Sequence, residues 1–175
     1  MRIPATLLCL VLLMPRTEAA AQGPSDFGGL GASFPIELAA GKRIKFSAYI
    51  MTERVRGYAG LWWRADKDST RSAAFDNMYN RGPGDNSQWK RYQIQLDIPK
   101  DIVNIAFGIL LVGSGTAWFA DLKIEVDKKL YTEDDFDLEL TSDRPRGFRT
   151  VGTAYEWVAD TLRLYNGKPT YRIRR

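Results

Sequence analysis

The residues best suited to chemistry lie in the short segment 59–65 and in the polar stretches that follow it. Period-two alternation in a strand places Leu61 and Trp63 on the core face, and Trp62 and Arg64 on the opposite face. A flat aromatic ring can stack on the C–H face of a sugar, and planar amide, carboxylate or guanidinium groups can bind paired hydroxyls. The pattern therefore predicts a non-covalent ligand site formed by Trp62, Arg64, Asp76, Asn77 and Arg81.

A purely structural interpretation of the same residues is also open. In that interpretation Trp62 covers a sheet, Arg64 pairs with Asp76, and Asn77 shapes a turn. Asp76 and Asn77 cannot both point outward from a regular strand, because neighbouring residues face opposite sides. A ligand site that uses both residues therefore requires a bulge or a strand end at this point.

The composition excludes several kinds of catalytic site. The 175-residue chain contains no histidine and one cysteine, Cys9, so it has no His-based triad and no cluster of thiolate zinc ligands. Asp and Glu are numerous, but no spacing among them singles out the pair of acids that glycoside hydrolysis needs. A formal net charge of +4 is too mild to predict a nucleic-acid partner. We therefore expect a protein that is not an enzyme.

Residues 1–21 have the features of a secretory signal peptide. Arg2 gives a short basic start, an apolar run extends from Leu7 to Met14, and small residues at 19–21 supply a cleavage site. The apolar run is shorter than the roughly 20 residues that span a bilayer. We expect export to the periplasm or outside the cell, with no membrane span.

Three segments alternate apolar and polar residues, as half-buried strands do. Gly and Pro at 81–86 and Gly at 113–115 indicate turns between strands, and Pro99 indicates the end of one. Trp89 is expected to pack in the core, because tryptophan is usually largely buried. Short strands with this punctuation predict an all-β fold, an antiparallel β-sandwich. The predicted core-facing residues are Ile44, Phe46, Ala48 and Ile50; Tyr92, Ile94, Leu96 and Ile98; and Trp118, Ala120, Leu122, Ile124 and Val126.

Two pieces of sequence carry a resemblance to a known fold. They are Gly60-Leu61-Trp62-Trp63-Arg64 and Phe75-Asp76-Asn77-Met78, within a longer pattern that includes Leu96-Asp97-Ile98-Pro99. Residues 33–126 resemble the galactose-binding-like jelly-roll domain, which is similar to carbohydrate-binding modules and occurs in exported bacterial proteins and attached to some regulators. The resemblance implies a jelly-roll β-sandwich that binds rather than catalyses.

The order of the pieces differs from the usual one. Residues 136–175 resemble the opening of such a domain, yet they follow the segment that resembles its remainder, which suggests circular permutation. We expect the main part of the sandwich at 22–127, a polar linker at 128–135, and completing strands at 136–175. The alternative is that 136–175 begins a truncated second copy. The segment from Tyr155 to Leu162 fits a helix by its local pattern, but the resemblance favours a strand there.

The resemblance also implies a structural calcium ion. In similar modules an acidic residue of the opening strand and one of the closing strand often hold calcium, which prefers oxygen ligands. The corresponding candidates are Glu139, Asp137 and Asp121. Solvated acids near strand ends are the competing interpretation, so calcium is only a possible cofactor.

These observations favour a non-catalytic module that binds a saccharide or a similar polyol-bearing polymer. The first alternative is a structural or protein–protein interaction sandwich with no small ligand. The second is an enzyme similar to a glycoside hydrolase.

Export gives a direct prediction. In its native host the mature protein should begin near Gln22, after cleavage next to Ala21. Mass spectrometry of the intact protein measures this directly. A protein that keeps Met1 in its native host would contradict export.

Overall fold

The protein is an antiparallel β-sandwich, as the alternation predicts. The computed structural model describes residues 26–131, 140–141, 144–145, 148–152 and 155–175. Within these ranges a single short helix, α1 (Ile36–Ala39), interrupts a chain that is otherwise strands and connections. No helix in this described part is long and apolar enough to cross a membrane.

The strands differ greatly in length, and two of them exceed 20 residues. The strands are β1 (Phe27–Ser33), β2 (Arg43–Asp66), β3 (Ser72–Asp76), β4 (Asp85–Asp97), β5 (Asn104–Val126), β6 (Lys129–Tyr131), β7 (Leu140–Thr141), β8 (Arg144–Pro145), β9 (Arg149–Val151), β10 (Glu156–Tyr165) and β11 (Lys168–Arg174).

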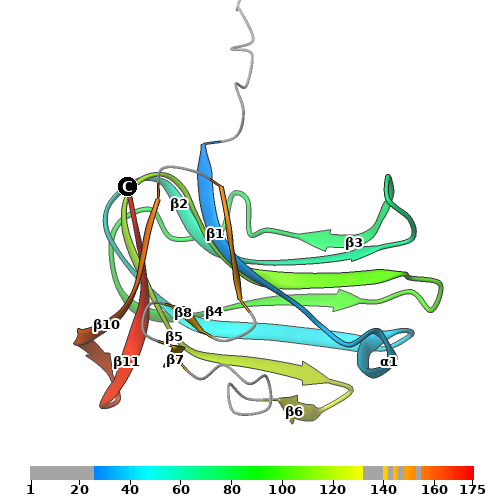
Figure 1. Ribbon diagram of the computed structural model, residues 1–175. Helices are drawn as coiled ribbons and strands as arrows, with labels where there is room; N and C mark the ends of the chain where they lie inside the picture. Colours follow the sequence, from blue (N-terminus) through cyan, green and yellow to red (C-terminus); the bar gives the residue numbers. More distant parts are fainter. Residues whose placement is uncertain (1–25, 132–139, 142–143, 146–147, 153–154) are drawn as a thin grey trace, which may run out of the picture.

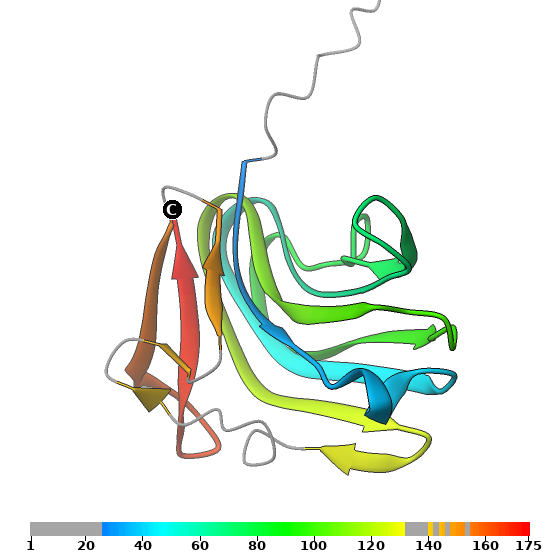
Figure 2. The ribbon, with the colours of Figure 1, turned by 45° about the vertical axis from the view of Figure 1, so that its right-hand side comes forward.

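One hydrogen-bonded sheet makes both layers of the sandwich, because β2 and β5 run through both (Figures 1 and 2). Layer A has the order β3, β2 (residues 57–66), β5 (104–113), β1 and β9. Layer B contains β4, β2 (43–53) and β5 (116–126). On the side of β5 away from β2, β6 pairs with residues 124–126 of β5 and β11 pairs with residues 116–119. Strand β10 then pairs with β11.

The two long strands bend together at a crease made by glycines. Gly57 on β2 lies opposite Gly113 on β5, and both have positive φ, as has Gly115. A Cβ atom at Gly57 would overlap the carbonyl oxygen of Val112, and one at Gly113 would overlap that of Arg56. Only glycine meets both conditions easily. The prediction that 113–115 is a turn between strands is therefore wrong: the glycines bend one strand without ending it.

The core lies between the layers and is rich in aromatic rings. Trp63 is fully buried and packs on Phe107 at 5.5 Å between ring centroids, with Phe34 at 5.3 Å and Phe46 at 6.3 Å. The predicted inward residues of 43–50 and 92–98 all belong to this core or pack against it.

The predicted alternation of 118–126 is wrong at its start. Asp121 has a φ of 53°, and the pairing of β2 with β5 shifts at this point. This bulge reverses the alternation, so Phe119 enters the core while Trp118 packs on the outer side. There the indole N–H of Trp118 donates a hydrogen bond to Asp160 at 2.9 Å.

The C-terminal segment pairs with both layers. Residues 156–165 form strand β10, so the strand interpretation of this segment is confirmed and the helix is not. Strand β9 pairs with β1, and β11 pairs with β5. The predicted linker 128–135 contains β6 at Lys129–Tyr131, and its residues from 132 on lie outside the described ranges.

The first and last described residues meet. Arg175 forms an ion pair with Asp26, and its backbone exchanges two hydrogen bonds of 3.0 Å with Gly115 at the crease. The carbonyl oxygen of Asp26 accepts hydrogen bonds from Gly113 N–H and from the hydroxyl of Tyr155. Asp26 and Arg175 are thus both fixed to the crease.

The crease should be sensitive to a single methyl group. Gly113→Ala should lower the free energy of unfolding by clearly more than Gly167→Ala, measured by urea denaturation. Both glycines have positive φ, which costs an alanine roughly 1–2 kcal/mol, but a Cβ at Gly167 meets no atom within 4 Å. Equal losses for the two variants would show that the crease tolerates a side chain.

Candidate functional site

A hollow of about 1070 Å³ opens on the outer face of layer A, on the side away from the core. Its side chains come from alternate positions of neighbouring strands, the positions that the core does not use. The lining residues are Asp26, Phe27, Tyr58, Trp62, Arg64, Asp66, Phe75, Asn77, Tyr79, Asn104, Ala106, Leu110, Val112 and Val151.

Trp62 forms the floor of this hollow. It lies opposite Gly108 on β5, which in turn lies opposite Gly31 on β1. A Cβ at Gly31 would come within 2.5 Å of the indole atom Cζ2, and one at Gly108 within 2.8 Å of Nε1. The indole therefore extends along the surface of three strands, over two residues that have no side chain. Without glycine at these two positions the indole could not occupy this place in the hollow.

Other aromatic side chains stand around the floor. Phe75, on β3, is 54% exposed, and Tyr79, in the following loop, is 64% exposed. Tyr58 packs edge-on against Tyr79, with 6.0 Å between ring centroids. Burial, with Tyr79 and Asp76 nearby, raises the pKa of Tyr58 above its ordinary value. Its hydroxyl therefore remains a hydrogen-bond donor at neutral pH.

Arg64 is fixed by a buried carboxylate. Its Nε donates to Oδ1 of Asp66 at 2.6 Å, and Nδ2 of Asn104 donates to Oδ2 of the same group at 3.1 Å. Burial of Asp66 opposes its ionisation, but these two hydrogen bonds outweigh the burial and hold the pKa of Asp66 below its ordinary value. Asp66 is therefore charged at neutral pH.

The structure separates the five predicted ligand residues. Trp62, Arg64 and Asn77 line the hollow, whereas Asp76 and Arg81 do not. Asp76 lies opposite Trp63 in the β2–β3 pair and so faces the other side of the sheet. There it forms an ion pair with Arg81. The structural alternative of an Arg64–Asp76 pair is also wrong, because Arg64 binds Asp66.

Asn77 reaches the hollow because strand β3 ends just before it. Its Oδ1 accepts the backbone N–H of Tyr79 at 3.1 Å, and Oδ1 of Asp76 accepts that of Met78 at 2.9 Å. The two side chains lie on different sides, so the strand end does not bring Asp76 and Asn77 into one ligand site.

Trp89 is not in the core, contrary to expectation. It is half-buried and packs on Tyr165 at 5.1 Å between ring centroids, on the outer side of layer B. The alternation that turns Tyr92 and Ile94 inward turns Trp89 outward.

Two of the three calcium candidates, Glu139 and Asp137, lie outside the described residues. The third, Asp121, is exposed and pairs with Lys123 at 2.8 Å. The ranges that the structure describes contain no group of three or more acidic, histidine or cysteine side chains placed to hold a metal.

Sequence reasoning missed Asp66, Phe75 and Asn104. Asp66 continues the alternation of Trp62 and Arg64 along β2, so extending the segment by two residues would have found it. Asn104 lies directly opposite Asp66 in the β2–β5 pair. That contact joins residues far apart in the chain, and the local pattern gave no signal for it.

No protein-family model matches the chain. A protein of Bacillus subtilis (strain 168), the uncharacterized HTH-type transcriptional regulator YbfP, is 34% identical over 104 residues. The similar region covers 59% of this chain and 35% of the regulator. The chain thus matches about a third of that relative's length.

The two adjacent tryptophans should behave oppositely in folding. Trp63→Ala should lower the free energy of unfolding by roughly 3–5 kcal/mol, the scale for deleting a core aromatic. Trp62→Ala should change it by only about 1 kcal/mol, because Trp62 lies outside the core, on the outer face of layer A. Chemical denaturation of both variants measures the difference.

Trp63→Phe provides the control. Within the described residues Nε1 of Trp63 has no hydrogen-bond partner, so phenylalanine should lose less stability than alanine. A larger loss for Trp62→Ala than for Trp63→Ala would contradict the assignment of the two faces.

Proposed function

We propose that the protein is a non-catalytic module that binds a saccharide or a similar polyol-bearing polymer in the hollow of layer A. The observation that carries this proposal is the Trp62 indole, which lies against Gly31 and Gly108 and lines the hollow. A sheet that needed only a cover for its outer face would not require glycines on two strands beneath the ring. A flat, fixed aromatic face is what the C–H surface of a sugar packs on.

The remaining lining suits the same ligand. Arg64, Asn77 and Asn104 supply planar polar groups at the rim, while Ala106, Leu110 and Val112 keep the rest apolar. The volume of about 1070 Å³ lies at the upper end of the roughly 300–1,000 Å³ that is typical of small-ligand pockets, which gives room for a segment of a polymer.

The lining also favours binding over catalysis. Hydrolysis of a glycosidic bond needs two available acids. The two carboxylates of the hollow, Asp66 and Asp26, are each held in an ion pair, with Arg64 and Arg175. An enzyme similar to a glycoside hydrolase is therefore the less favoured function.

The fold proposal is a galactose-binding-like jelly roll formed by a single, circularly permuted domain. The pairing of β9 with β1 and of β11 with β5 supports this, since the C-terminal strands continue the layers that the earlier strands begin. A truncated second copy would not need these pairings.

The cellular proposal is export to the periplasm or outside the cell, which rests on the signal-like residues 1–21.

The similarity to part of a transcriptional regulator supports a module that also occurs joined to other domains. The one described helix has four residues, too short for a helix-turn-helix motif. We therefore relate this chain to a part of the regulator other than its DNA-binding region.

A protein partner is the second candidate. Leu162 is 95% exposed and Leu164 is 48% exposed, both on the bulged part of β10. Exposed leucines of this kind suit a protein contact, but they are far fewer than the side chains of the hollow.

Binding to the hollow should depend on Trp62. Trp62→Ala should weaken saccharide binding by on the order of 1–3 kcal/mol, the scale for an aromatic anchor, while Trp89→Ala, a half-buried aromatic of layer B, should change it little. A glycan array followed by titration with the strongest ligand measures both variants, and a glycosidase assay beside it should show no turnover. Equal effects of the two variants, or turnover of the bound glycan, would overturn the proposal.

A further inference from the structure

We infer that the saccharide carries a carboxylate, as uronic acids do, and that Arg64 receives it while Asp66 and Asn104 hold Arg64 in position. This inference rests on the proposed function, because it assigns the ligand class of the same hollow.

The first step is the anchoring of Arg64 from behind. Asp66 is only 7% exposed, and both of its oxygens are occupied, one by Arg64 and one by Asn104. A buried carboxylate with two hydrogen bonds is a fixed group. It holds Nε of Arg64 at 2.6 Å and therefore sets the direction of the guanidinium plane.

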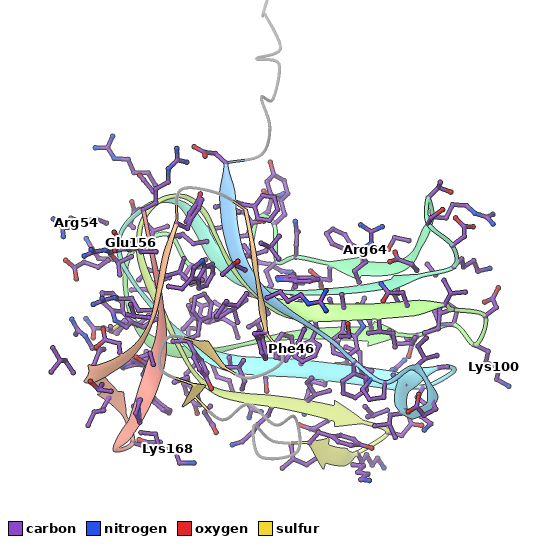
Figure 3. The ribbon with its side chains drawn as sticks, viewed as in Figure 1. Phe46, Arg54, Arg64, Lys100, Glu156 and Lys168 are labelled. Carbon is purple, nitrogen blue, oxygen red and sulfur yellow. The ribbon has the colours of Figure 1, made fainter. Side chains whose placement is uncertain are left out.

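The second step concerns the other edge of the guanidinium. Among the described residues, the contact with Asp66 is the only hydrogen bond that the side chain of Arg64 makes. Its Nη1 and Nη2 groups are thus open to a ligand. The side chain of Arg64 is 45% exposed against 10% for Asp66, so the positive group stands in front of the negative one. Figure 3 shows Arg64 on the side of the strands away from the core residue Phe46.

The third step is the balance of donors and acceptors. The Oδ1 acceptor of Asn77 is used by Tyr79 N–H, which leaves its Nδ2 donor to the hollow. Tyr58 keeps a protonated hydroxyl at neutral pH, as a tyrosine ordinarily does. Together with the fork of Arg64, these groups offer mainly donors. A carboxylate accepts two parallel hydrogen bonds from such a fork, which a neutral hydroxyl pair matches less well.

The fourth step is spacing. Trp62 and Arg64 are two residues apart on one face of β2, and both line the same hollow. A sugar held at Trp62 can therefore direct a carboxylate toward Arg64.

The test compares polygalacturonate with its fully methyl-esterified form, which has the same backbone without the charge. By isothermal titration at low salt, the protein should bind the acid form at least about tenfold more tightly, and the ratio should fall as salt screens the charge. Arg64→Lys should bring the ratio close to one, because lysine cannot pair with Asp66 and also present a fork. Arg56→Lys, on the same strand but outside the hollow, should leave the ratio unchanged. Thermal melting of each variant verifies folding.

Asp66→Asn tests the positioning role separately. If Asp66 mattered only by its charge, its removal would raise the preference for the acid form; the positioning account expects the preference to fall. A rise overturns the role of Asp66. Equal binding of the two polymers, or a preference that survives in Arg64→Lys, overturns the acidic ligand. Binding of neutral saccharides alone overturns this inference and leaves the proposed function standing, whereas binding of no saccharide overturns both.

Discussion

Strands β2 and β5 stay hydrogen-bonded to each other while they pass from one layer to the other, and the place of every other element follows from this bend. The crease needs backbone angles and close approaches that a side chain would obstruct, at Gly57 and Gly113 above all. The bend brings two halves of one sheet face to face and so encloses the core. Asp26 and Arg175 form their ion pair at this bend, and Asp26 also lines the hollow on the outer face of layer A.

Within layer A, strict alternation places adjacent residues on opposite faces, where they have different roles. Trp63 contributes to the stability of the core, where Phe34, Phe46 and Phe107 surround it. Trp62, one residue earlier, adds little to that core and is placed over glycines at the floor of the hollow. The same alternation continues to Arg64 and Asp66. The contribution of β2 to the proposed site therefore follows from the pattern of one strand, and its outward residues can change without altering the core.

Local alternation was enough to predict the sandwich and the two faces at Trp62 and Trp63, because these depend only on strand geometry. Local alternation failed where the pairing between strands determines which side chains face the hollow and which meet. Asp76 faces away from the hollow because it lies opposite Trp63, and Asn104 reaches Asp66 only through the β2–β5 register. It also failed where the backbone departs from a regular strand, since the positive φ of Asp121 turns Trp118 outward. Glycines at 113–115 indicated a change of direction correctly, but the bend keeps the strand intact.

The central claim, that ligand binds on the outer face of layer A, can be tested most directly by nuclear magnetic resonance. The chain has five tryptophans, and each gives one indole N–H signal in a proton–nitrogen correlation spectrum. On titration with an acidic oligosaccharide the signal of Trp62 should move progressively, while those of Trp89 and Trp118, on the outer side of layer B, should stay in place. Shifts confined to Trp89 or Trp118 would place the ligand on the other layer and contradict the account.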